Sequence, residues 1–176
     1  MKAHSPLQQI SHWDMELCLL FNRQSRRLSI RQLFRIASRL GDGVFWYVLM
    51  SVLLLRYQAD ALLPVIHMLA AGGTGTLIYK LIKSKTLRPR PFNVSPDIIC
   101  AGNTLDQFSF PSGHTLHATV FSIVAVYYFP ALVWLLLPFS LLVALSRPIL
   151  GLHYPSDVLA GALIGATLAS ASFLLV

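Results

Sequence analysis

Three short polar stretches carry side chains that are suited to chemistry on a charged oxyanion. They read KSKTLRPRPF (83–92), FPSGHTLHA (110–118) and SRPILGLHYPSD (146–157). Taken singly, each has an ordinary explanation, because basic residues such as Lys85 or Arg88 at a helix end usually act as interfacial anchors, and Pro-Ser-Gly usually starts a helix. Together they supply cations, two histidines, a serine and an aspartate, and this combination indicates a site.

Cations beside a helix N-terminus form a binding site for a multiply charged oxyanion, because exposed N–H groups and the helix dipole add to the side-chain charge. Ser112 and Gly113 stand where an apolar stretch begins, so a hydroxyl and a free N–H can face phosphate. His153 precedes Asp157 by four residues, with Pro155 suited to the first turn of a helix. The carboxylate can then hydrogen-bond one imidazole nitrogen and leave the other free to attack.

The elements that position these stretches are strongly apolar. The chain has 176 residues, 55% of them hydrophobic and only 12% charged, which is outside the usual range of a soluble domain. A helix that crosses a bilayer needs about 20 apolar residues. Apolar stretches of this length, or shorter ones whose flanks reach the interface, lie at 44–55, 61–79, 117–129, 131–145 and 158–176. The sequence predicts an all-α fold, a polytopic transmembrane helix bundle of about five spans.

The N-terminal part has a different pattern. Residues 13–40 alternate apolar side chains with six arginines, which is typical of one helix, or two short ones, lying in the membrane surface. The apolar run 15–21 contains Glu16 and leads into no small-residue cleavage site, so we expect it to be retained. We predict one domain over 1–176, with an interfacial amphipathic segment at 1–40 and a transmembrane bundle at 43–176.

Five spans place all three polar stretches on one face of the membrane. The N-terminal segment and the loops 83–110 and 147–154 fall on this face, while 58–60, Pro130 and the C-terminus fall on the other. The site is therefore expected at one end of the bundle.

The net charge of +7 indicates anionic lipid headgroups as partners rather than nucleic acid, because the basic residues are not interleaved with aromatics on a soluble face. The two cysteines, Cys18 and Cys100, support no metal site. The sequence leaves open whether they pair, and it leaves open the oligomeric state.

The polar stretches together resemble the signature of the type-2 phosphatidic acid phosphatase superfamily, which is related to bacterial acid phosphatases and vanadium haloperoxidases. In this sequence Lys83 is followed by six residues and Arg90-Pro91, Pro111-Ser112-Gly113-His114 is intact, and Ser146-Arg147 is followed by five residues, His153, three residues and Asp157. Arg88-Pro89 does not fit the first element, since the matching position holds Leu81 instead of lysine.

The resemblance implies a metal-independent hydrolase of phosphoric esters or anhydrides that uses no cofactor. His153 would attack phosphorus and form a phosphohistidine, Asp157 would orient it, and His114 would protonate the leaving oxygen and then activate water. The groups implied to hold the phosphate oxygens are Lys83, Arg90, Ser112, Gly113 and Arg147. No carboxylate pair that would suggest a metal is visible among Asp42, Asp60, Asp97 and Asp106.

The expected activity is that of an integral membrane lipid phosphatase acting on an ester of the undecaprenyl diphosphate, phosphatidylglycerol phosphate or phosphatidate class. The alternatives are a vanadate-dependent haloperoxidase-like enzyme, a lipid A phosphatase or phosphotransferase, and a binding protein with a dead site. Both histidines are present, which argues against the last alternative.

The expected location is a bacterial inner membrane. Family members usually face the periplasm or the cell exterior, whereas nearly all Lys and Arg lie on the active-site face, which the positive-inside rule would make cytoplasmic. We favour the outer face, because phosphate binding accounts for some of these cations.

Other polar and small residues have structural explanations. We expect His117 to be a packing or interfacial residue and His67 to be a buried hydrogen-bonding side chain. Gly161 and Gly165 form a GxxxG pattern that lets two helices approach closely.

Overall fold

The computed structural model describes residues 6–104 and 106–176, with side chains from residue 11 onward, and its named elements are all helical. A bundle is formed by α3 (Phe45–Tyr57), α4 (Leu62–Thr86), α6 (Gly113–Tyr128), α7 (Val133–Ile149) and α8 (Pro155–Ser172). Two helices precede it, α1 (Pro6–Arg23) and α2 (Leu28–Arg39), while α5 (Pro91–Val94) is a single turn. The predicted all-α class and the predicted helical N-terminal segment are both present.

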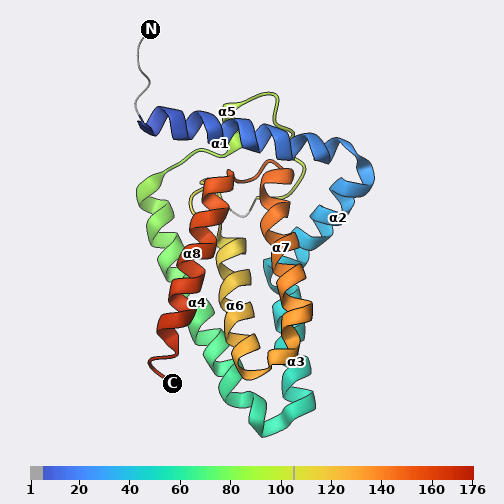
Figure 1. The fold of residues 1–176 in the computed structure, drawn as a ribbon, viewed down its shortest axis with the longest axis vertical. Coiled ribbons are helices and arrows are strands. Elements are labelled where there is room, and N and C mark those ends of the chain that lie inside the picture. Colours follow the sequence, from blue (N-terminus) through green and yellow to red (C-terminus); the bar gives the residue numbers. More distant parts are fainter. Residues whose placement is uncertain (1–5, 105) are drawn as a thin grey trace.

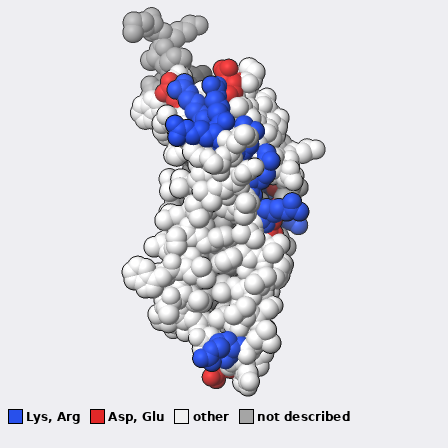
Figure 2. All heavy atoms as spheres, turned by 90° about the vertical axis from the view of Figure 1, so that its right-hand side faces the viewer, with Lys and Arg blue, Asp and Glu red and all other residues white. Residues whose placement is uncertain are grey.

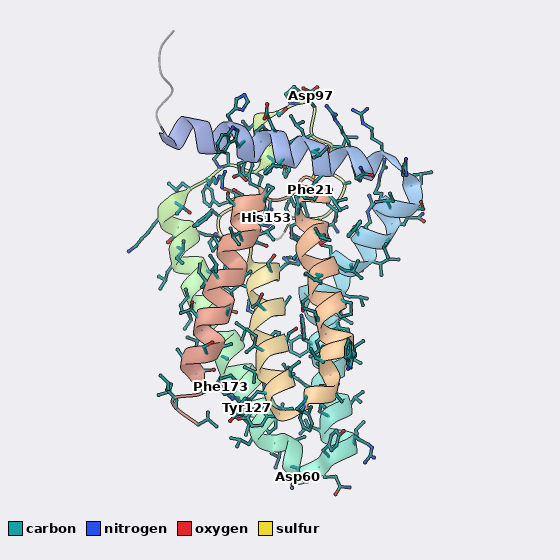
Figure 3. All side chains as sticks on the ribbon, in the orientation of Figure 1. Phe21, Asp60, Asp97, Tyr127, His153 and Phe173 are labelled. Carbon is teal, nitrogen blue, oxygen red and sulfur yellow. The ribbon has the colours of Figure 1, made fainter. Side chains whose placement is uncertain are left out.

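The two ends of the bundle differ. In Figure 1, α1 crosses one end of the bundle, with α5 and its loops on the same side. Figure 3 places His153 and Asp97 at this end, and Asp60 at the opposite end together with the turn between α3 and α4. This arrangement agrees with the predicted division of the loops into two groups.

Helix α6 forms the centre of the bundle and packs against α4, α7 and α8. Its residues Leu116, Val120 and Val124 are fully buried, in one cluster with Trp46 of α3 and Met68 of α4. Because α6 begins at the site end, this core fixes the position of its first turn.

The helix ends that surround the site follow from local chemistry. Helix α4 stops where Leu87 adopts a left-handed conformation (φ 48°), shortly before Pro89. Helix α8 starts with Pro155 in its first turn and Asp157 as part of a capping box with Tyr154. Gly43 has φ 136°, a conformation that favours glycine, and it turns the chain from α2 into α3 within Leu40–Val44.

The predicted count of five spans is not confirmed. Two helical stretches of the described residues are long and apolar enough to cross a membrane, the continuous run Leu28–Thr86 and Pro130–Ile149. Helices α3, α6 and α8 have 13, 16 and 18 residues, so each falls short of the roughly 20 residues that a straight crossing needs. Helix α4, with 25 residues, exceeds that length as a single helix of the bundle.

The surface of the bundle is apolar between its ends. Figure 2 shows the Lys, Arg, Asp and Glu side chains of this face at one end and along one edge to about its middle, with a small group at the other end and an uncharged band between the two groups. Large exposed apolar side chains on the bundle helices include Ile66, Leu77, Leu141, Leu159 and Leu163. A surface of this kind is expected for a protein whose sides contact lipid.

Candidate active site

Residues from separate segments line one cavity of about 130 Å³ at the α1 end of the bundle. Its lining comprises Gly41, Asp42, Tyr79, Lys83, Arg90, Asp106, Gly113, His114, His117, Arg147 and His153. We call this the cation cavity. Six of the eight predicted site residues line it, namely Lys83, Arg90, Gly113, His114, Arg147 and His153.

The three cations come from different elements and are nearly fully buried, with exposed fractions of 6% for Lys83, 2% for Arg90 and 1% for Arg147. Lys83 Nζ donates to both carboxylate oxygens of Asp106 (2.9 and 2.8 Å), and Arg90 Nη2 donates to Asp106 Oδ1 (2.8 Å). Arg147 Nη1 donates to Ser38 Oγ of α2 (2.5 Å). A carboxylate therefore binds two of the cations that are predicted to bind phosphate.

Arg147 also has an unused donor. Its Nε is buried and has no hydrogen-bond partner within the described residues. A buried donor without a partner is costly, and a phosphate oxygen in the cation cavity is the kind of group that would satisfy it.

His153 presents one imidazole nitrogen to the cations. Its Nε2 lies 3.2 Å from Arg90 Nη1, which donates to it if the proton of the ring is on Nδ1. Burial, followed by the positive charges of Arg147, Arg90 and Lys83, holds the pKa of His153 well below its usual range. The imidazole is therefore neutral at physiological pH, with the Nε2 lone pair on the side of Arg90.

The predicted hydrogen bond between His153 and Asp157 is not formed. His153 Nδ1 lies 3.7 Å from Asp157 Oδ2, which is ion-pair rather than hydrogen-bond distance. The reason is that Asp157 has other partners, since Oδ2 accepts from the Tyr154 backbone N–H (2.8 Å) and Oδ1 accepts from Arg88 Nη1 (2.7 Å). The carboxylate still lies on the Nδ1 side of the ring, where it favours a proton on that nitrogen.

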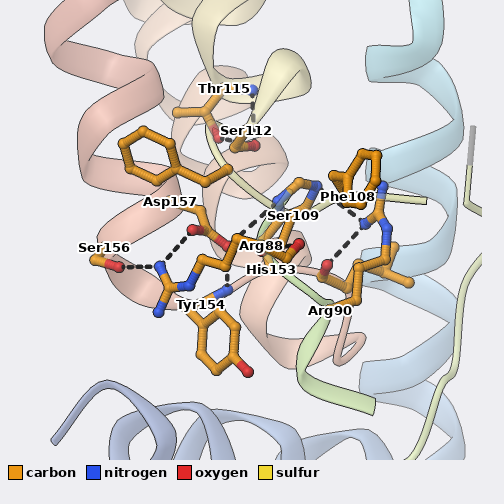
Figure 4. A network of polar contacts seen from close by, with 12 residues as sticks. Arg88, Arg90, Phe108, Ser109, Ser112, Thr115, His153, Tyr154, Ser156 and Asp157 are labelled. Atoms are coloured by element: carbon orange, nitrogen blue, oxygen red, sulfur yellow. Dashed lines mark hydrogen bonds and ion pairs between the residues drawn. The ribbon is translucent and has the colours of Figure 1, made fainter. Parts of the chain in front are cut away.

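The interpretation of Arg88 as a solvated interfacial anchor is wrong. Its guanidinium pairs with Asp157 and, through Nη2, with Asp14 of α1 (2.6 Å). Figure 4 shows Arg88 between Tyr154, Ser156 and Asp157, close to His153. Burial alone would lower the pKa of Arg88, but the carboxylates of Asp157 and Asp14 raise it above its usual value, so the charge is retained.

His114 has a carboxylate partner that the sequence did not reveal. Its Nε2 contacts Asp42 Oδ1, from the kink between α2 and α3. Asp42 also lines the cation cavity, so a histidine with a bound carboxylate faces the same space as His153. This pairing suits a residue that must give and take a proton.

Ser112 acts as a helix cap in the structure. Its hydroxyl accepts from the Thr115 backbone N–H (3.4 Å), contacts Thr115 Oγ1 (3.0 Å) and is fully buried. It is absent from the lining of the cation cavity within the described residues, whereas Gly113 and His114 are part of it. The cap explains the serine structurally and starts α6 at the edge of the site.

A second cavity adjoins the cation cavity between α3, α4 and α6. It has a volume of about 330 Å³ and shares Gly41, Asp42 and His117 with the first. The rest of its lining is mostly apolar or small, namely Gly43, Trp46, Tyr47, Met50, Leu69, Gly72, Gly73, Thr76 and Phe121. We call it the apolar cavity.

The structural explanations of His67, Gly161 and Gly165 are confirmed, whereas His117 is hydrogen-bonded but also lines both cavities. His117 bonds to the Gly113 carbonyl (2.9 Å) and Thr76 Oγ1 (3.0 Å), and His67 bonds to Tyr128 and Ser172. Gly161 and Gly165 face the backbone of α6 and its first turn.

Residues 61–176, which include all three polar stretches, match the PAP2 superfamily. The chain belongs to the PAP2 superfamily. The resemblance seen in the sequence is thereby confirmed, because these are the type-2 phosphatidic acid phosphatases.

Curated PAP2 relatives differ in how much of their length is matched. The chain is 29% identical over 157 residues to an undecaprenyl-diphosphatase of Sulfolobus acidocaldarius, covering 87% of this chain and 73% of the relative. It is 38% identical over 96 residues to the undecaprenyl-diphosphatase BcrC of Bacillus subtilis, covering 53% of this chain and 49% of the relative. It is 32% identical over 137 residues to phosphatidylglycerophosphatase B of B. subtilis, covering 72% and 59%.

Two solved PAP2 structures share the fold. LpxE of Aquifex aeolicus superposes with a TM-score of 0.75 at 26% identity, covering 90% of this chain and 93% of LpxE. A phosphatidylglycerolphosphate phosphatase from B. subtilis gives a TM-score of 0.75 at 24% identity, covering 98% and 87%, and this likeness concerns the fold alone. The matches confirm the expected enzyme class, a membrane lipid phosphatase of the PAP2 superfamily.

The PAP2 site contains carboxylates and a guanidinium that the sequence reasoning missed, namely Asp14, Asp42, Arg88 and Asp106. For two of these residues, their position in the sequence near a predicted site residue could have indicated a role in the site. Asp106 lies five residues before Pro111 of the second polar stretch, and Arg88 lies two residues before Arg90. Asp14 had a weaker signal, because the polar residues Asp14, Cys18 and Asn22 recur every fourth position of a helix.

Proposed function

We propose that the protein releases phosphate from a lipid phosphate or diphosphate through a phosphohistidine, without a metal, with the whole chain acting as one domain. The observation that carries the proposal is that one cavity is lined by Lys83, Arg90 and Arg147 together with His114 and His153. Several fixed and buried cations stabilise the charge of a phosphoryl transition state, and the two histidines can serve as nucleophile and acid.

The first chemical step transfers the phosphoryl group to His153. Its Nε2 forms a bond to phosphorus while the bond from phosphorus to the leaving oxygen breaks, and the cations hold the nonbridging oxygens. Asp157 favours the tautomer with a proton on Nδ1 and stabilises the positive charge that the ring gains. Arg90 Nη1, which lies 3.2 Å from His153 Nε2, leaves this lone pair free when the ring attacks phosphorus.

His114 acts in both steps. It gives its proton to the leaving lipid oxygen, and it then takes a proton from the water that attacks the phosphohistidine, which frees phosphate and restores His153. Asp42 accepts from His114 and holds the ring during both transfers. We also propose that the Gly113 N–H contributes to phosphate binding, while Ser112 contributes by capping α6.

The names of the relatives support a polyprenyl or glycerolipid phosphate as substrate. Undecaprenyl diphosphate is our first candidate, because two of the three relatives described above are undecaprenyl-diphosphatases. The apolar cavity adjoins the cation cavity and is suited to the first part of the lipid tail, since both cavities share Gly41, Asp42 and His117.

The experiment that tests this function is a phosphate-release assay of the purified protein in detergent. The substrates are undecaprenyl diphosphate, phosphatidylglycerol phosphate and phosphatidate, each with and without a chelator of divalent cations. We expect release from at least one of them, unaffected by the chelator and abolished by His153→Ala. No release from any of these lipids, or release restored only by added magnesium, would exclude the proposal.

We further propose that α3, α4, α6, α7 and α8 are five spans in a bacterial inner membrane, and that the cation cavity opens to the periplasm or exterior. The uncharged band in Figure 2 supports a bilayer around the bundle. The short helices α3, α6 and α8 can cross if the interface begins close to their ends, as tilt and local thinning of the bilayer allow.

A further inference from the structure

A polar stripe runs along the face of α1 that points to the bundle. Asp14, Cys18 and Asn22 recur every fourth residue and are all buried. The opposite face exposes apolar side chains, with Trp13 at 64% and Leu20 at 55% exposure. An interfacial helix needs the apolar face, but the buried polar face requires a different explanation, because buried polar groups are retained only with specific partners.

Every residue of the stripe contacts the segment that carries His153. Asp14 Oδ1 accepts from the Ser156 backbone N–H (3.0 Å), and Cys18 Sγ donates to the His153 carbonyl (3.7 Å). Asn22 Nδ2 donates to the Ile149 carbonyl (3.0 Å). These contacts hold the segment before, at and after the nucleophile, and in Figure 1 α1 lies across this end of the bundle.

Asp14 is also connected to Asp157, because Arg88 donates hydrogen bonds to both carboxylates. One end of the guanidinium, Nη2, donates to Asp14, and the other end, Nη1, donates to Asp157 Oδ1 (2.7 Å) and Ser156 Oγ (2.8 Å). The guanidinium lies 3.9 Å from the centroid of the Tyr154 ring, which fixes its plane. Both ends and one face of Arg88 are therefore held.

Asp157 depends on this arrangement. Its side chain is fully buried, and a buried carboxylate keeps its charge and orientation only when it is paired. Arg88 is the cation that pairs with it among the described residues, since Lys83 and Arg90 are bound to Asp106. The orientation of Asp157 in turn fixes which side of the His153 ring carries the proton.

We propose that Arg88, held by Asp14 of α1, is a positioning residue that fixes Asp157 and thereby the tautomer and orientation of His153. This inference rests on the proposed function, in which His153 is the nucleophile. Arg88 is not among the described residues that line the cation cavity, so it acts through Asp157 rather than on phosphate. Helix α1 lies outside the residues that match the PAP2 superfamily, yet it becomes part of the catalytic unit.

The first test compares Asp14→Asn and Arg88→Gln with two matched controls. Glu16→Gln removes an exposed carboxylate of the same helix, and Lys85→Gln removes an exposed cation of the neighbouring segment. We expect kcat to fall on the order of 10-fold or more in the first two variants, as is typical when a residue that orients a catalytic histidine is changed. We expect the KM for the lipid and the inhibition constant of inorganic phosphate to stay within about twofold of wild type, because positioning, not binding, is lost.

The second test asks whether the effect passes through Asp157. In an Asp157→Asn background, adding Asp14→Asn should cause no further loss of kcat. With Asp157 intact, Arg88→Lys should retain more activity than Arg88→Gln. Losses that multiply in the double variant, or a wild-type kcat in Asp14→Asn, would overturn the inference. Asp14→Asn keeps the shape of the side chain, so it decides the question if Arg88→Gln does not fold.

A third measurement is independent of turnover. Nitrogen-15 NMR of the histidine side chains reports the tautomer of His153, identified by its absence in His153→Asn. We expect Asp14→Asn and Arg88→Gln to change this signal, and Glu16→Gln and Lys85→Gln to leave it as in wild type. Unchanged signals would refute the positioning role, whereas a wild-type protein inactive on every lipid phosphate with the expected NMR changes would refute the proposed function alone.

Discussion

At the scale of single residues, Asp106 is bound to two of the cations that we propose bind phosphate. Its carboxylate accepts from Lys83 with both oxygens and from Arg90 with one. Burial would raise the pKa of Asp106, but Lys83 and Arg90 lower it below its usual value, so the carboxylate is charged at neutral pH. A phosphate that enters the cation cavity must share these donors or displace the carboxylate.

Replacing this carboxylate should strengthen phosphate binding. In Asp106→Asn, which keeps the shape and removes the charge, we expect inorganic phosphate to inhibit at a concentration lower by on the order of 10-fold, the equivalent of one charge-assisted hydrogen bond. The measurement is competitive inhibition of lipid phosphate release. Asp97→Asn, an exposed carboxylate of the same loop region, is the control and should behave as wild type. Weaker inhibition in Asp106→Asn would mean that the carboxylate orients the cations instead of competing for them.

The ionisation of His153 gives a second prediction at this scale. Because burial and three cations hold its pKa well below the ordinary value of about 6.5, the ring should stay neutral as the pH falls through 6.5 and become protonated only at lower pH. Protonation removes the lone pair, so activity that depends on the nucleophile is present above this pKa and lost below it. Nitrogen-15 NMR titration of wild type against His153→Asn measures the midpoint. A midpoint at or above 6.5 would contradict the electrostatic account.

The role of His114 is tested by the leaving group. An aryl phosphate leaves without much help from an acid, whereas a lipid alkyl phosphate needs its oxygen protonated. In His114→Ala we therefore expect a loss of kcat on the alkyl substrate at least about 10-fold larger than on the aryl substrate. The measurement is kcat of His114→Ala and wild type on the two substrates. Equal losses of kcat on both substrates would show that His114 is not the acid.

Single residues also show what the sequence can and cannot predict. The gathering of Lys83, Arg90, His114, Arg147 and His153 in one cavity was predictable, because their types suit an oxyanion site and their spacing resembles the family signature. Their pairing with particular carboxylates was not, since an ion pair between distant segments leaves no pattern in one sequence that identifies both partners. The expected hydrogen bond from Asp157 to His153 failed for a related reason, because the spacing of four residues does not reveal that Arg88 and the Tyr154 N–H compete for that carboxylate.

At the scale of helices, close packing of α6 and α8 fixes the start of the site. A Cβ atom at Gly161 would lie 2.5 Å from the Ser112 carbonyl oxygen, and one at Gly165 would lie 2.7 Å from the Leu116 carbonyl oxygen. Both obstacles are backbone atoms, which cannot rotate away. The two glycines therefore set the distance between α8 and the first turns of α6.

This packing gives a prediction with an internal control. We expect Gly161→Ala to lower the free energy of unfolding by about 1–3 kcal/mol, as overpacking of a tight contact does, and to reduce activity by displacing Gly113 and His114. Gly73→Ala makes the same change in α4, where an added Cβ would meet nothing within 4 Å, so we expect unchanged or slightly higher stability. Thermal unfolding in detergent and phosphate release measure both effects. Equal stability of the two variants would show that α6 and α8 can separate at little cost.

The sequence predicted where the helices lie more successfully than it predicted which segments they contact. The apolar stretches and the GxxxG pattern gave the bundle, because the period and length of apolar runs determine helices directly. The N-terminal segment was correctly predicted to be helical and to lie at the site end. Because of its arginines, however, the predicted partners of this segment were lipid headgroups. Its buried polar stripe of Asp14, Cys18 and Asn22 became interpretable only when the structure placed it against the His153 segment.

At the scale of the whole molecule, the charges on the face drawn in Figure 2 form two groups, a larger one that starts at one end and a small one at the other end, with an uncharged band between them. The sequence predicted this division from the order of its loops. It did not determine the number of spans, because helices of 13 to 18 residues are near the limit of what a bilayer requires. Whether the two ends lie on opposite sides of a membrane is therefore the property that shows whether the helices of the bundle cross it.

Thiols placed at opposite ends can decide this. Cys100 is exposed in the loop at the end that carries His153, while Cys18 is buried, and burial, together with the charges of Asp14 and Asp157, raises the pKa of the Cys18 thiol to about 12. Cys18 should thus stay protonated and unreactive in the native protein, so it can remain in place. A membrane-impermeant maleimide applied to intact spheroplasts should label Cys100 in the natural chain. In a Cys100→Ser, Asp60→Cys variant, whose thiol lies at the opposite end, it should label only after the membrane is permeabilised. Labelling of both thiols in intact spheroplasts would exclude an odd number of spans between the two ends. Labelling in intact spheroplasts of the thiol at position 60 but not of Cys100 would place the cation cavity on the cytoplasmic side.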